Sequence, residues 1–168
     1  MRSHPSARRA LGSGGLTLAR VARAYRREAR ETGRDLPWLL VLTDEQRVWF
    51  RQHGRRLATL LLAHLDATDD EAAARLDEAA AEATIYGQQA TDLGLSMSQT
   101  VEGFLAFRRP FLHELGAVAE RRAFETDEAT NLLLAAEQAM DRLLVATLEG
   151  RGSTPAGRAP PKHRPAVG

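Results

Sequence analysis

The sequence predicts an all-α protein, an antiparallel bundle of about five helices with a basic segment at each end. Apolar residues recur at three- and four-residue steps through most of the chain, which is the period of a helix with one buried face. No stretch alternates apolar and polar residues with β-branched enrichment, so strands are not expected. Two Ser/Thr-x-x-Gln patterns and short polar breaks divide the chain into segments of helical length.

The composition excludes several kinds of site. The chain has 168 residues, enough for one sizeable core. It has no cysteine, which excludes disulfides, thiolate metal sites and cysteine nucleophiles. No apolar run approaches the roughly 20 residues of a membrane span, and no apolar stretch of a signal peptide follows the basic start. We expect a cytoplasmic protein that is not embedded in a membrane.

The net charge of +1 conceals three regions of opposite sign. Residues 1–34 contain nine arginines and two glutamates, residues 35–150 contain ten arginines and twenty acids, and residues 151–168 contain four cations and no acid. We therefore expect a flexible basic segment over 1–15, a helical bundle over 16–150 and a disordered proline-rich tail over 151–168. The basic ends can attract nucleic acid or acidic proteins, or remain solvated against the acidic body.

A first helix is expected just after residue 15, with an apolar stripe on one face and arginines on the others. The stripe consists of Leu18, Val21, Ala22, Tyr25 and Ala29. The arginines are Arg20, Arg23, Arg26, Arg27 and Arg30. Gly33 is a candidate residue just past the end of this helix, and the apolar run 36–42 is expected to form a connector or a short helix at the core.

Thr43 and Gln46 form a capping-box pattern, which predicts a second helix from this point to about Leu65. Its expected core residues are Val48, Trp49 or Phe50, Leu57, Leu60, Leu61 and Leu65. A third helix is expected over 69–93, ending at Gly94, since glycine adopts the left-handed conformation without steric cost. This helix has a stripe of small residues that would let a neighbouring helix approach closely. The stripe is Ala72, Leu76, Ala79, Ala80, Ala83, Tyr86, Gly87 and Ala90.

Ser96 and Gln99 form a second capping-box pattern at the start of a fourth helix. Pro110 lies inside this helix and its ring conflicts with the carbonyl four residues earlier, so we expect a kink or a restart nearby. A fifth helix is expected over 127–149, with Gly150 ending it.

The sequence contains no recognisable catalytic, cofactor or metal-ligand set. The glycine-rich segment 12–15 lacks the lysine and the preceding strand of a phosphate-binding loop. No histidine has a ligand partner at helical spacing, and Ser96 and Ser98 are explained as helix caps. We therefore predict that the protein is not an enzyme, with haem binding through His64 or His113 as a remote alternative.

The basic pair Arg108 and Arg109 interrupts an otherwise apolar helix, with His113 one turn after Arg109. Either the arginine stems cover the edge of the core and pair with Glu102 or Glu114, or one head group binds an anionic ligand or partner.

One region resembles a known family. The stretch from Tyr86 to Ser96, followed by Val101 to Arg109, presents a helix, a Gly-apolar-Ser turn and a second helix bearing apolar residues and arginine. It is similar to the N-terminal helical domain of RsbT co-antagonist, stressosome-type bacterial regulators, over about residues 17–149. The resemblance implies an all-helical, globin-like input or scaffold module without haem and without enzymatic activity. The usual C-terminal output domain of such regulators is not present in this sequence.

Two functions follow as expectations. The first is a signalling or regulatory module that acts through protein contacts, expected to be a homodimer, with Arg108, Arg109, His113 and Tyr86 as candidate contacts for a partner or ligand. The alternative is a DNA-associated regulator that uses the arginine-rich first helix and the tails, which predicts steeply salt-dependent DNA binding.

Overall fold

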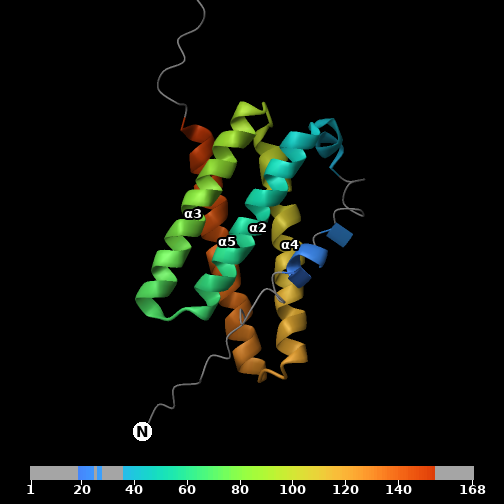
Figure 1. Ribbon diagram of the computed structural model, residues 1–168. Helices are drawn as coiled ribbons and strands as arrows, with labels where there is room; N and C mark the ends of the chain where they lie inside the picture. Colours follow the sequence, from blue (N-terminus) through green and yellow to red (C-terminus); the bar gives the residue numbers. More distant parts are fainter. Residues whose placement is uncertain (1–18, 25, 28–35, 154–168) are drawn as a thin grey trace, which may run out of the picture.

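The computed structural model describes residues 19–24, 26–27 and 36–153, and over these residues it confirms an all-α bundle without strands (Figure 1). A short 3-10 helix precedes four long α-helices. The elements are η1 (Pro37–Val41), α2 (Asp44–Asp66), α3 (Asp69–Asp92), α4 (Met97–Arg121) and α5 (Thr126–Gly152).

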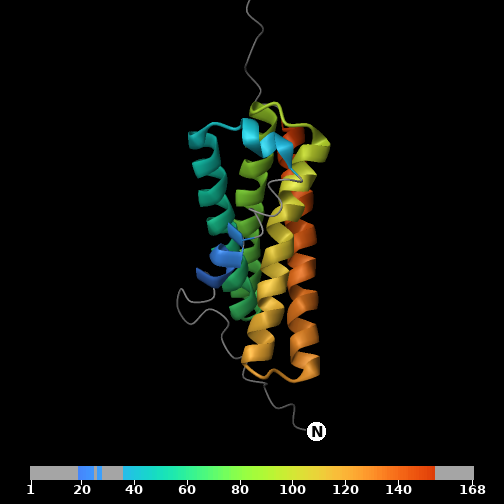
Figure 2. The same ribbon diagram turned by 90° about the vertical axis from the view of Figure 1, so that its right-hand side faces the viewer.

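Consecutive long helices run in opposite directions, so α3 and α5 point the same way and pack closely along their length (Figure 1). α2 packs against α3, and α4 packs against α5. The described part of the expected first helix is helical and lies beside α2 and α4 (Figure 2). Leu18, Tyr25, Ala29, Arg30 and Gly33, like the predicted segment 1–15 and the tail beyond 153, fall outside the described residues.

Both predicted capping boxes are confirmed. The Thr43 hydroxyl accepts a hydrogen bond from the Gln46 amide at 3.2 Å, and the Gln46 side chain accepts from the Thr43 amide at 2.8 Å. Ser96 and Gln99 make the same two bonds at 3.1 and 2.8 Å. Gly94 ends the α3 region with φ +71°, as its position predicts. These local signals place the helix starts within one residue of their expected positions.

The main core lies between the long helices and is built from alanine, leucine and phenylalanine. Its most enclosed large side chains include Leu61, Phe111, Leu115, Met140 and Leu143. A smaller cluster at one end packs Leu36, Trp38, Leu42, Ala90 and Leu95 together. Part of the 36–42 run therefore lies at the core as predicted, whereas Leu40 and Val41 are 69% and 81% exposed.

Two details of the predicted elements are wrong, and one alternative is excluded. Val48 is 40% exposed and lies outside the core. Near Pro110, where a kink or a restart is expected, α4 continues as one helix, which excludes the restart. Gly150 does not end the last helix, which continues to Gly152; Gly150 is instead buried where α5 meets α3. A side chain on Gly150 would collide with the backbone of Thr84, so this glycine serves helix packing rather than helix termination.

Arg151 therefore belongs to the folded body rather than to the tail. Its guanidinium Nη1 donates to Thr100 Oγ1 at 2.6 Å and to the Leu95 carbonyl at 2.8 Å. These bonds join the end of α5 to Leu95 in the turn before α4 and to Thr100 in the first turn of α4.

Candidate anion-binding groove

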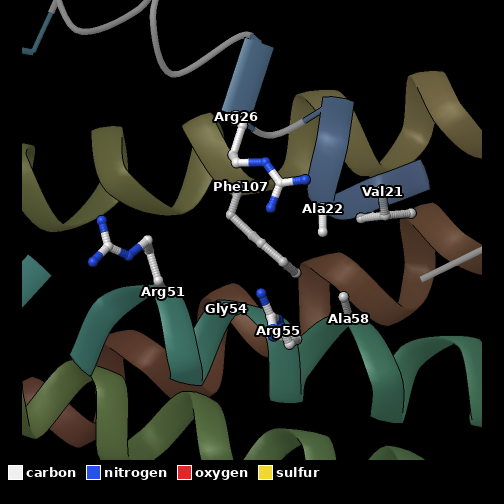
Figure 3. A pocket seen from close by; sticks show the side chains of 8 residues that line it. All are labelled: Val21, Ala22, Arg26, Arg51, Gly54, Arg55, Ala58 and Phe107. Atoms are coloured by element: carbon white, nitrogen blue, oxygen red, sulfur yellow. The ribbon is translucent and has the colours of Figure 1, made fainter. Parts of the chain in front are cut away.

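An apolar groove bordered by arginines opens between the helical residues 19–24 and 26–27, α2 and α4 (Figure 3). Its volume, measured with a water-sized probe, is about 70 Å³. The residues lining it are Val21, Ala22, Arg26, Arg51, Gly54, Arg55, Ala58 and Phe107. Among the described residues, it therefore combines an uncharged floor with three cationic side chains and no acidic one.

Two small features of α2 shape the floor of the groove. Gly54 carries no side chain, and a Cβ atom placed there would lie 3.9 Å from the Phe107 ring, an ordinary contact distance. Ala58 follows one turn later on the same face of α2. Phe107 itself is 8% exposed and extends the row of core aromatics formed with Phe104 and Phe111. The groove thus remains open because glycine and alanine stand where larger side chains could stand.

The helical repeat places the groove arginines on one side of the molecule. Arg51 and Arg55 are four residues apart in α2, so their side chains leave the helix one turn apart. Arg26 extends from the first helical segment toward the same opening (Figure 3). All three arginines are exposed.

Several arginines of the bundle form ion pairs with neighbouring acids. Arg47 pairs with Asp44 at 2.8 Å, and this hydrogen bond is the main reason that the pKa of the Asp44 carboxyl is lowered. The pairs Arg56–Glu82, Arg75–Glu78, Arg121–Glu114 and Arg142–Asp77 bring other cations into contact with carboxylates. Within the described part of the chain, no ion pair at contact distance is found for Arg26, Arg51 or Arg55.

A shallower groove continues along the outer face of α2. It shares Arg51 and Arg55 with the first groove and adds Val48, Gln52, Arg56, Thr59 and Leu60. From Arg47 to Leu65 the helix has four arginines and no acid. The positive surface therefore extends beyond the enclosed groove, over about three turns of α2.

A buried acid lies behind this face. Glu82 of α3 is 5% exposed; its carboxylate contacts His53 Nδ1 and lies 2.9 Å from Arg56 Nε. The Trp49 ring stacks on His53 with centroids 3.7 Å apart. Glu82 thus offsets the charge of Arg56 from within the bundle, whereas Arg51 and Arg55 have no such contact.

The four residues singled out from the sequence do not form one site. Arg108 points across to α5, where it pairs with Asp141 at 3.3 Å and Glu137 at 3.4 Å. Its expected partners Glu102 and Glu114 instead bind Trp38 and Arg121, so that part of the prediction is wrong. The more general prediction, that one of these arginines forms ion pairs with acids of the protein, is correct for Arg108.

The other three lie on two different sides of the fold. Arg109 and His113 are exposed, one turn apart on α4. Tyr86 is buried on α3, with its ring 5.4 Å from that of Phe50 and its hydroxyl beside Gly103. His64, named as a remote haem ligand, donates from Nδ1 to the Ala72 carbonyl at 2.7 Å, the hydrogen-bonded role expected of an isolated histidine.

Sequence reasoning did not single out Arg51, Arg55 or Glu82. The sequence does contain a pattern that indicates a basic surface on this helix. Four of the ten arginines in the acidic region 35–150 fall between residues 47 and 56. Glu82 gave no such signal, since its burial depends on contacts with another helix.

Among the described residues, no group of three or more His, Asp or Glu side chains is arranged to hold a metal ion. No helix in that part of the structure is long and apolar enough to cross a membrane. Comparisons with protein-family models, with curated proteins and with solved structures found no match to this chain.

Proposed function

We propose that this chain is a non-enzymatic bacterial regulatory module that binds an acidic partner protein through the arginine-lined groove and the adjoining face of α2. The observation that carries the proposal is the set of cations Arg26, Arg51 and Arg55 around an apolar floor, with which no acid among the described residues forms an ion pair. A stress-response input or scaffold role, as in RsbT co-antagonist-type regulators, fits this activity.

The form of the groove favours a protein over DNA. A protein segment can place apolar side chains on Phe107 and Val21 and carboxylates near the arginines, using both properties of the groove. Phosphate contacts use only the charges. A long duplex would extend over more of the acid-rich region 35–150, with ten arginines against twenty acids, than a short acidic segment confined to the groove, and its polyanion would be repelled there.

The first test compares two anionic probes on the full chain. We expect a fluorescein-labelled twelve-residue oligoglutamate to bind, and to bind at least fivefold more weakly to an Arg51→Gln/Arg55→Gln variant. Arg75→Gln/Arg142→Gln removes the same charge from α3 and α5 and should leave the affinity within twofold. A 20-base-pair duplex is titrated in parallel at 50 and 200 mM NaCl by fluorescence anisotropy.

Two outcomes would overturn the proposal. Equal losses in both double variants would mean that the protein attracts acids through its overall charge and not through the groove. Tighter binding of the duplex, falling steeply with salt and abolished by Arg51→Gln/Arg55→Gln, would favour the DNA-associated alternative.

The homodimer stays a prediction. Exposed apolar side chains on α5 support it: Leu134 is 52% exposed and Val145 54% exposed, and they lie three turns apart on one face. If this face joins two copies, Leu134→Glu/Val145→Glu yields a monomer by light scattering while the unmodified chain has twice that mass. A monomeric unmodified chain would refute this arrangement.

A further inference from the structure

The groove also indicates what kind of acidic segment it receives. We infer that the partner presents one leucine-sized apolar side chain, with carboxylates on both sides of it in sequence, and that this side chain is seated on Phe107. This inference rests on the proposed function and specifies the partner's recognition element.

The size of the groove selects a single side chain. A water molecule needs about 10–15 Å³ of cavity measured with a water-sized probe. The 70 Å³ of the groove therefore holds about five such volumes, which suits one branched aliphatic side chain and is too small for a packed helix face.

The chemistry of the floor selects an apolar group. Val21, Ala58 and Phe107 supply only carbon atoms to the space between them, and Gly54 adds no side chain. An apolar side chain placed there leaves water without losing hydrogen bonds, whereas a polar one would lack partners in the floor. Phe107 is already packed in the core, so it offers a surface that needs little ordering on binding.

The positions of the three arginines favour a partner segment with acidic residues on both sides of its apolar side chain. Arg26 approaches from the first helical segment, and Arg51 and Arg55 approach from α2, so the positive charges border the floor from two elements (Figure 3). Carboxylates on both sides of the apolar anchor can each reach an arginine, and guanidinium groups bind carboxylates in a two-pronged geometry. In protein–protein interfaces, the residues that contribute most to the binding affinity usually lie at a buried centre, which is surrounded by a polar or charged rim.

The test uses three short peptides and NMR titration of the full chain. The first peptide has one leucine between two pairs of glutamates; the second has serine in place of leucine; the third has lysines in place of the glutamates. We expect the leucine peptide to bind about tenfold more tightly than the serine peptide, the scale expected for burying one aliphatic side chain. The lysine peptide should not bind.

A variant that fills the groove separates the anchor from the charges. Gly54→Leu adds a side chain whose Cβ lies 3.9 Å from the Phe107 ring. It keeps all three arginines and replaces a helix-interior glycine by a better helix former. We expect it to reduce leucine-peptide binding to the level of the serine peptide. Gly116→Leu makes the same exchange on α4, where no atom lies within 4 Å of the added Cβ, and should bind like the unmodified chain.

The outcomes test the apolar-anchor inference and the proposed function separately. If the leucine and serine peptides bind equally, or if Gly54→Leu leaves leucine-peptide binding unchanged, the apolar-anchor inference is wrong while acidic recognition stands. If neither acidic peptide responds to Arg51→Gln/Arg55→Gln, the proposed function fails as well.

Discussion

The carbonyl oxygen of Thr147 occupies the space that a side chain on Gly87 would need. A Cβ atom on Gly87 would fall far inside van der Waals contact with that oxygen and 2.9 Å from the carbonyl carbon. Gly150 meets the backbone of Thr84 in the same way from the opposite helix. Two glycines thus let α3 and α5 approach each other more closely than side chains would permit.

Gly87→Ala should therefore destabilise the bundle although alanine favours helices. Because Thr147 is buried and its contact is made by backbone, the helices must separate, at a cost of about 1–3 kcal/mol. Urea denaturation followed by circular dichroism measures this change. Gly116→Ala is the matched control, since its Cβ meets nothing within 4 Å. It should stabilise the protein by about 0.5–1 kcal/mol. Equal effects of the two substitutions would disprove the close-approach argument.

Arg151 should contribute to stability through its hydrogen bonds to Thr100 and Leu95. Arg151→Met keeps most of the side-chain volume but leaves the buried Thr100 hydroxyl without its guanidinium donor, and should lower the free energy of unfolding by about 1–3 kcal/mol. Arg142→Met removes a pair between exposed side chains and should cost less than about 1 kcal/mol. Chemical denaturation of both variants checks the order; a larger loss at Arg142 would contradict it.

Glu82 should matter more for folding than an exposed acid of the same helix. Glu82→Gln removes the charge that faces His53 and Arg56 from inside the bundle, and we expect a loss of about 1–3 kcal/mol in unfolding free energy. Glu78→Gln acts on an exposed pair with Arg75 and should be nearly neutral. Thermal unfolding at neutral pH compares them, and an unchanged melting temperature for Glu82→Gln would refute the structural role.

The pKa of Asp44 should depend on Arg47. The hydrogen bond and charge of Arg47 lower the pKa of this carboxyl in the folded protein, so its pairing favours the folded state above the ordinary carboxyl pKa. That contribution disappears as the pH falls through the lowered value. Arg47→Gln should raise the pKa of Asp44 toward its ordinary value, measured by NMR titration of the side-chain carboxyl carbon. No change would show that Arg47 does not hold the carboxylate.

The sequence predicts the features that depend only on residues within about one helical turn of each other. The capping boxes at Thr43 and Ser96 and the glycine at 94 each satisfy local hydrogen-bonding or conformational needs, which neighbouring residues fix on their own. Gly150 was misassigned because glycine suits both a helix end and a close crossing. Only the position of Thr84 on another helix distinguishes the two.

The candidate site is formed by residues from several helices that are distant in the sequence. For that reason the sequence alone does not predict most of it. The sequence singles out Arg108 as a charge in an apolar helix, but the acids that form ion pairs with it lie on α5. The sequence does not single out Arg51, since an exposed arginine on a helix is ordinary, and only the structure shows that none of the described acids is in ion-pair contact with it.

Hydrogen exchange with the leucine-centred acidic peptide tests the central claim most directly. If the arginine-lined groove is the binding site, added peptide should slow exchange in residues 19–27, in the 51–58 segment of α2 and around Phe107, and Gly54→Leu should abolish the effect. Slower exchange confined to α5, or no change in these three segments at a peptide concentration that saturates binding, would contradict the account.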